Sequence, residues 1–213
     1  YFSIIWDELK SAFSENKFII LFSTLLFVIP MLFGYFFASY ISEAMNPVIN
    51  SFRERVQQGD IQLTHDSIFF NNVYVGIILY CGAITFGLLT ASVLISNGVF
   101  IGYFATKMPL YSFLLLTLPH GIFEIPAIII AGSSGFIMFK FLVEFFKGIV
   151  KPVITNDEVR LSVKNRIANS LNNNINRLTQ SLVLLGFSVV LFIIAAFIEA
   201  YLTIGIARLF MIF

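Results

Sequence analysis

Between Ile68 and Thr106 the chain carries no Asp, Glu, Lys or Arg, and most of this stretch is apolar. The hydrocarbon core of a bilayer is about 30 Å thick and is crossed by roughly 20 residues of helix. The stretch is therefore too long for one membrane span. Only 12% of all residues are charged and 58% are hydrophobic, with a mean hydropathy of +0.91. Such a chain has too few polar groups to cover a water-soluble fold.

The sequence predicts an all-α fold, a polytopic transmembrane helical bundle of about five spans in a single domain, residues 1–213. The predicted spans lie near residues 18–40, 72–96, 98–118, 121–139 and 182–203. Asn97-Gly98 is the expected break inside the long uncharged stretch. Lys107 and Pro109 interrupt 98–118, so this segment is expected to be a broken or re-entrant helix that neighbouring protein covers.

Amphipathic helices are expected outside the spans. One precedes the first span, and another covers 47–58, with Asn46-Pro47 at its start. A third covers 155–180 and opens with the capping box Thr155 to Glu158. The apolar side of this third helix consists of Val163, Ile167, Leu171, Ile175, Leu178 and Leu182.

Lys and Arg residues orient the chain by the positive-inside rule. With five crossings and a cytoplasmic N-terminus, eight of them fall inside and two, Arg53 and Arg55, fall outside. The re-entrant alternative leaves eight inside as well. Both arrangements predict that the 147–180 segment faces the cytoplasm, and the expected location is the cell membrane of a prokaryote.

Polar side chains within the predicted spans are the candidate site: His120, Glu124, Glu199 and Asn97. His120 and Glu124 are four residues apart and share a helical face just after Pro119. An ionised carboxylate in the bilayer costs a few kcal/mol, so each glutamate must be protonated, paired or near water. Three interpretations stay open: packing through hydrogen bonds, a pathway for a proton, ion or lipid headgroup, and a metal or catalytic site.

Other chemistry is not expected from the sequence. The chain lacks the H-E-x-x-H motif, and a hydrolytic metal site usually takes three protein ligands, which only His120, Glu124 and Glu199 together would supply. No cofactor or metal is predicted, and Cys81 alone forms no intramolecular disulfide. A net charge of +1 gives no sign of nucleic-acid binding.

Three segments resemble the stage II sporulation protein M family. They are the Asn97-Gly98 segment up to Gly102, the Pro-His-Gly-x-x-Glu segment from Pro119 to Glu124, and the Ile-Glu-Ala segment around Glu199. The resemblance extends over nearly the whole chain from the first span onward. By motif position it marks Asn97, Gly98, Pro119, His120, Gly121, Glu124 and Glu199.

This resemblance implies an integral membrane protein. The family's namesake anchors two peptidoglycan-degrading partners at the septum of sporulating bacteria, and homologues occur in bacteria and archaea that never sporulate. We carry over only the general role, a non-enzymatic protein that anchors or organises a membrane complex. Expected partners are membrane lipids and proteins that bind helices 47–58 and 155–180, and a homodimer is also compatible with the small-residue patches. The alternative is a transporter, channel or lipid-translocating protein that uses Glu124 and Glu199, and a metal-dependent intramembrane hydrolase ranks third.

Overall fold

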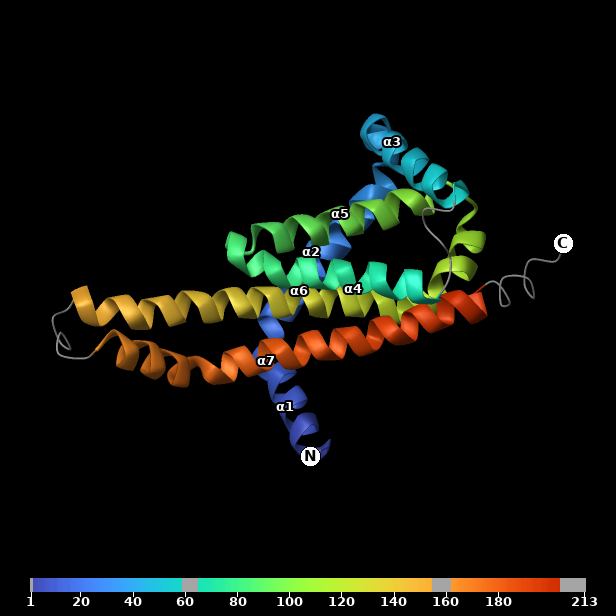
Figure 1. Ribbon diagram of the computed structural model, residues 1–213. Coiled ribbons are helices and arrows are strands. Elements are labelled where there is room, and N and C mark those ends of the chain that lie inside the picture. The colour runs from blue at the N-terminus through green and yellow to red at the C-terminus, as the bar shows by residue number, and fades with distance from the viewer. Residues whose placement is uncertain (1, 59–64, 155–161, 204–213) are drawn as a thin grey trace.

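The computed structural model describes residues 2–58, 65–154 and 162–203, and every regular element in these ranges is a helix (Figure 1). The all-α prediction is confirmed. In chain order the elements are α1 (Phe2–Glu15), α2 (Lys17–Phe36), α3 (Ala38–Gln57), α4 (His65–Cys81), η1 (Gly82–Thr85), α5 (Leu88–Ala105), α6 (Leu110–Ile154), α7 (Val163–Ile198) and η2 (Glu199–Thr203).

Five of the described helical segments are long and apolar enough to cross a membrane. They are Lys17–Phe36, Asp66–Thr85, Leu88–Ala105, Leu110–Val150 and Val163–Thr203. Large hydrophobic side chains stay exposed along them, because the outward faces of such helices meet lipid rather than water. The protein is therefore a multi-pass membrane protein, as its composition predicts.

The boundaries of the second and third spans differ from the prediction. The expected break at Asn97-Gly98 and the expected span 72–96 are wrong, since the chain turns at Gly82–Gly87 instead and Asn97-Gly98 lies inside α5. The expected broken or re-entrant segment 98–118 is also wrong. Its first part completes α5, and its last part begins α6 after a connection at 106–109.

The turn at Gly82–Gly87 depends on backbone geometry that hydropathy does not reveal. Phe86 and Gly87 both have positive φ, at 57° and 79°, and Gly87 donates its backbone N–H to the carbonyl of Gly82 over 3.0 Å. Glycine adopts this left-handed conformation without a Cβ penalty. The hydroxyl of Thr85 then accepts the backbone N–H of Leu89 over 3.1 Å and caps the start of α5.

Glycines allow α2 and α5 to approach closely. A Cβ on Gly98 would overlap the carbonyl oxygen of Phe27, and one on Gly102 would overlap that of Met31. Gly34 of α2 lies equally close to the carbonyl of Val99. Small residues spaced four apart let the backbones of membrane helices touch. Because the residue numbers of the contacting positions increase in the same direction along both helices, α2 and α5 run parallel.

The helices α6 and α7 form a long antiparallel pair. Gly148 lies against the side chain of Ser170, whose hydroxyl donates to the carbonyl of Phe145 over 2.7 Å. At 1.5 Å per residue, the 45 residues of α6 span about 67 Å, twice the hydrocarbon core. The predicted span 121–139 is thus the middle of α6 rather than a separate helix. Figure 1 shows the gold end of α6 and the orange start of α7 extending beyond α4 and α5.

The described part of the predicted cytoplasmic helix 155–180 and the predicted span 182–203 form one continuous helix. α7 starts at Val163 and runs without interruption to Ile198, and η2 continues it to Thr203. The capping box at Thr155 to Glu158 lies outside the described residues. The start of α3 was also predicted wrongly, because α3 begins at Ala38 and contains Pro47 in its interior.

Buried polar groups mark one end of the bundle. Asn16, between α1 and α2, donates its side-chain amide to Gln180 of α7 over 2.8 Å, and Gln180 donates to the carboxylate of Glu15 over 2.9 Å. Tyr80 of α4 lies 3.3 Å from the hydroxyl of Ser181. Beside this layer, Ala12 and Phe13 of α1 pack against a small cluster of apolar residues from α6 and α7. The polar layer therefore joins α1, α4 and α7 at the end from which the α6–α7 pair extends.

Candidate functional site

Two irregular helix segments meet at the opposite end of the α6–α7 pair. Pro119 lies within α6 and supplies no backbone N–H, and the yellow-green first turns of α6 bend away from its long remainder in Figure 1. Across from this bend, α7 passes into η2, a single π-helical turn at Glu199–Thr203. Such turns are rare and are found frequently at functional sites.

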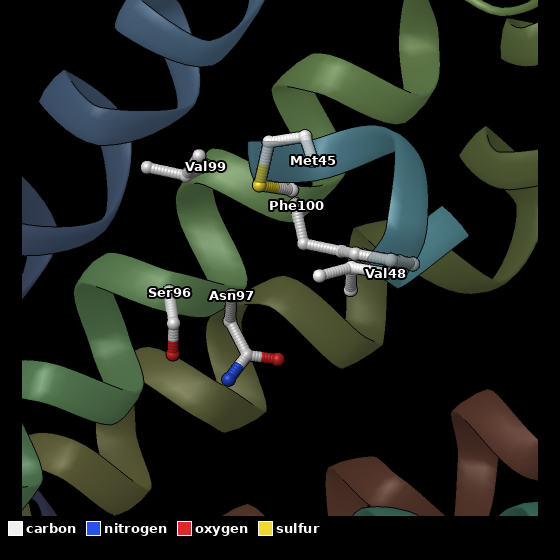
Figure 2. A pocket seen from close by; sticks show the side chains of 6 residues that line it. All are labelled: Met45, Val48, Ser96, Asn97, Val99 and Phe100. Carbon is white, nitrogen blue, oxygen red and sulfur yellow. The ribbon is translucent and has the colours of Figure 1, made fainter. Parts of the chain in front are cut away.

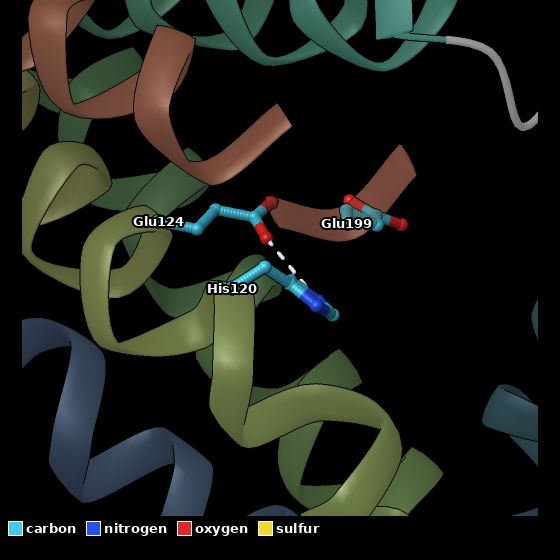
Figure 3. Close-up of side chains that lie close together, drawn as sticks. All are labelled: His120, Glu124 and Glu199. Atoms are coloured by element: carbon cyan, nitrogen blue, oxygen red, sulfur yellow. Dashed lines mark ion pairs between the residues drawn. The ribbon is translucent and has the colours of Figure 1, made fainter. Parts of the chain in front are cut away.

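His120, Glu124 and Glu199 lie together between these two segments (Figure 3). The Nε2 atom of His120 is 3.8 Å from a carboxylate oxygen of Glu124, one helical turn further along α6. One nitrogen or oxygen atom from each of the three residues lies within 4.8 Å of the other two. The structure thus brings together three of the four polar residues singled out in the sequence, and their role stays a prediction.

A fourth side chain, Thr203, fixes the ring of His120. The Thr203 hydroxyl is 3.3 Å from Nδ1 of His120 and donates to the carbonyl of Ile198 over 3.2 Å. In the tautomer whose Nδ1 carries the proton, Oγ1 accepts the Nδ1–H, and the lone pair of the neutral ring is on Nε2, the nitrogen that lies 3.8 Å from Glu124. The sequence analysis missed Thr203, although it lies four residues after Glu199 on the same segment.

The cluster is partly enclosed. The side chains of His120 and Glu124 are 12% and 25% exposed, which keeps them mostly out of solvent but reachable. Within the described ranges, neither Glu124 nor Glu199 forms an ion pair with a Lys or Arg. The two carboxylates therefore lie beside one imidazole, which carries a positive charge only when it is protonated.

Asn72 of α4 approaches the same end of the bundle. Its side chain is 7% exposed, and its amide nitrogen has no hydrogen-bond partner among the described residues. One turn away on the same face of α4, Gly76 contacts the ring of Phe192 of α7. α4 also contacts η2, the turn that contains Glu199.

Asn97 occupies a different place. Its side-chain amide donates to the carbonyl of Val93 within α5, over 2.8 Å. Figure 2 shows it in a groove of about 440 Å³ between α3 and α5, with Met45, Val48 and Phe100. None of the three clustered residues lines this groove. Asn97, the fourth candidate residue, thus lies apart from His120, Glu124 and Glu199.

The remaining motif residues are Gly98, Pro119 and Gly121. Gly98 permits the close approach of α2 and α5, and Pro119 lies within the first part of α6. Gly121 is buried, and a Cβ there would meet only side-chain atoms of Thr117 and Ile125 at ordinary contact distances. Its position therefore tolerates a small side chain.

A second polar cluster, missed in the sequence, lies where α3 meets α5. Tyr103 donates its hydroxyl to the side-chain oxygen of Asn46 over 2.5 Å, and Lys107 donates to both of these groups over 2.6 and 3.0 Å. The ammonium of Lys107 also lies 4.1 Å from the centroid of the Tyr103 ring. These bonds fasten α3 to the end of α5.

Comparison with known proteins decides the family. The profile described as stage II sporulation protein M matches residues 23–204, which contain all the motif residues above. The chain belongs to the stage II sporulation protein M family. The resemblance read from the three sequence segments is thereby confirmed.

Members of the stage II sporulation protein M family that are similar to this chain occur in the archaeon Methanocaldococcus jannaschii. The uncharacterized protein MJ0706 is 30% identical over 224 residues, covering 97% of this chain and 95% of that protein. The uncharacterized protein MJ0793 is 32% identical over 194 residues, covering 88% and 95%. No solved structure matches this chain.

Chemically, the cluster can do two things. The carboxylates and the imidazole can exchange protons, and the same three side chains can hold a cation. Both capacities depend on the bend at Pro119 and on the π turn, since these bring His120 and Glu199 to the same place from opposite helices.

Proposed function

We propose that this protein is a non-enzymatic membrane scaffold, located in the cell membrane, that binds a cytoplasmic protein through the projecting part of α7. The observation that carries the proposal is a partly exposed apolar face on α7, a helix whose 36 residues are more than one bilayer crossing requires. We call this face the α7 stripe and define it as Ile167, Leu171, Ile175 and Leu178.

The α7 stripe lies beyond the membrane-embedded part of the helix. Gln180 and Asn16 form the buried polar layer at one end of the bundle, and α7 extends 17 residues from Gln180 back to Val163. That length corresponds to about 25 Å of helix. Lys164, Arg166 and Arg177 lie in this part, and by the positive-inside rule they favour the cytoplasm.

The α6–α7 pair leaves the α7 stripe partly exposed, since Ile167 and Ile175 are exposed whereas Leu171 and Leu178 are half-buried. Ile167 and Ile175 are each 42% exposed, whereas Ser170, on the face toward α6, is 3% exposed. Contiguous apolar side chains in contact with water are typical of protein interaction sites. The positions are three or four residues apart, the spacing with which one helix docks against another.

The charges beside the α7 stripe favour a different protein over a second copy. Lys164 is exposed, Arg166 is half-buried, and Arg177 donates to Asn174 over 3.2 Å. A second copy would bring like charges together, which disfavours association, whereas an apolar surface with an acidic rim complements them. Helix 47–58 stays a second predicted contact region, and the side chains of Phe52 and Val56 within it lie outside the described residues.

Affinity purification from the native host in mild detergent tests this proposal. Ile167→Ser with Ile175→Ser removes two apolar side chains of the α7 stripe, and Asn169→Ser with Asn173→Ser makes matched changes on the opposite face. A stoichiometric partner that copurifies with the wild type and the Asn variant but not with the Ile variant supports the scaffold. A chain that purifies alone, or keeps its partner in the Ile variant, contradicts it.

Transport or lipid translocation is the second candidate function. The observation in its favour is the close approach of Glu124 and Glu199 on helices long and apolar enough to span a membrane. Intramembrane acids mark proton and ion pathways in many transporters. Reconstitution in liposomes tests it: a proton, ion or lipid flux that Glu124→Gln abolishes supports transport, and the same flux in both proteins counts against it.

A further inference from the structure

We propose that His120, Glu124 and Glu199 bind one divalent first-row transition-metal ion, with Zn²⁺ and Mn²⁺ as the fitting ions. This inference concerns the polar cluster and is independent of the scaffold role of the α7 stripe.

The geometry fits a small cation. Zinc binds imidazole nitrogen and carboxylate oxygen at about 2.0–2.2 Å, so two ligands of one tetrahedral ion are about 3.4 Å apart. The candidate ligand atoms lie within 4.8 Å of one another, and the Nε2 to carboxylate distance between His120 and Glu124 is 3.8 Å. Side-chain rotations that bring the ligand atoms closer together by roughly 1 Å would close the set around one ion.

The histidine has the orientation of a metal ligand. Metal-binding histidines donate the ring N–H that does not face the metal to a second group, which fixes their tautomer. Here the hydroxyl of Thr203, committed as donor to the carbonyl of Ile198, accepts the Nδ1–H of His120. The free lone pair of Nε2 then points to the side of the ring where Glu124 lies.

The charge of the cluster is neutralised either by protons on the carboxylates or by a bound cation. Two carboxylates this close together in a low-dielectric setting repel each other strongly. In the described ranges no Lys or Arg pairs with either Glu124 or Glu199, and a neutral His120 contributes no charge. A divalent ion would balance both carboxylates.

Asn72 of α4 is an almost fully buried amide whose nitrogen lacks a partner among the described residues, and α4 contacts η2, the turn that contains Glu199. Three protein ligands and partial exposure leave a position for water, as in zinc sites that are not purely structural.

Metal titration of the full-length protein in detergent tests the proposal. After treatment with a chelator, the wild type is titrated with Zn²⁺ and with Mn²⁺ in a calorimeter, and with Mg²⁺ and Ca²⁺ for comparison. We expect one Zn²⁺ or Mn²⁺ per chain, with affinity lowered at least about tenfold by Glu199→Gln and by His120→Ala. Glu144→Gln, which changes an exposed acid paired with Lys147, should leave the affinity unchanged. Absence of binding, equal binding in all variants, or binding of Ca²⁺ alone would overturn the assignment.

A measurement on the unaltered protein covers the case in which the variants fail to fold. Diethyl pyrocarbonate modifies accessible neutral imidazoles, and peptide mass spectrometry separates His120 from His65. We expect Zn²⁺ to slow modification of His120 while that of His65 proceeds at its metal-free rate. Equal rates at His120 with and without Zn²⁺ would contradict metal binding at this site.

Discussion

Gly98 of α5 rests against the carbonyl of Phe27 of α2, with no room for even a Cβ between them. One turn later, Gly102 makes the same contact with the carbonyl of Met31. This backbone contact aligns α2 with α5. It gives Gly98 of the Asn97-Gly98 motif a role in helix packing.

Gly98→Ala should destabilise the fold. The added methyl must push two helix backbones apart, and overpacking of this kind costs about 1–3 kcal/mol. Thermal unfolding in detergent measures the effect. Gly186→Ala is the matched control, because a Cβ at Gly186 meets nothing within 4 Å and the helix gains propensity. Equal melting temperatures for the two variants would show that α2 and α5 do not pack this closely.

Gln180→Leu should also destabilise, because it leaves the buried amide of Asn16 with one unmet hydrogen bond. Asn16 and Gln180 are 8% and 4% exposed, and an unsatisfied buried donor costs about 1–3 kcal/mol. A double variant, Asn16→Leu with Gln180→Leu, removes both partners and should recover part of the loss. Unfolding in detergent of the two single variants and the double variant gives the coupling energy. A coupling near zero would mean that the bond between α1–α2 and α7 does not form.

Acid should loosen the contact of α1 with α7. Hydrogen bonds from Ser11 and Gln180 hold the pKa of Glu15 below its ordinary 4.5. A carboxylate with a lowered pKa stabilises the folded state above the ordinary value, and that contribution is lost as the pH falls through the lower folded pKa. Trp6, the sole tryptophan, lines a groove between α1 and α7 with Phe13 and Phe187, so its emission reports the change.

The midpoint of this fluorescence change should lie below pH 4.5 in the wild type. Glu15→Gln should abolish the transition, whereas Glu8→Gln, on the same helix, should keep it. A transition that persists in Glu15→Gln would assign the effect to another acid.

The sequence predicts the helical class and the number of spans well, because both follow from long runs without charge. It misplaces the turn between the second and third spans for a physical reason. Asn97-Gly98 has the composition of a turn, yet its glycine serves helix packing, which only the neighbouring α2 reveals. The real turn at Gly82–Gly87 lies in an apolar run, and its left-handed Phe86 carries no signal of its own.

The candidate site was predictable in part. The spacing of His120 and Glu124 places both on one face of a helix, and the structure agrees. Glu199 joins them because of how far α7 runs along α6 before η2 begins. This register between the two helices cannot be read from a single sequence. Asn97 lies in a groove between α3 and α5, away from the other three candidate residues, and its role stays a prediction.

The central claim, that the α7 stripe binds another protein, is tested most directly by photo-crosslinking in cells of the native host. A photoreactive amino acid replaces Ile175 on the stripe or, as control, Asn173 on the opposite face, and adducts are identified by mass. We predict one dominant adduct with a different protein from position 175 and none from position 173. Absence of an adduct at 175, equal adducts at both positions, or an adduct only with a second copy of this chain would contradict the account.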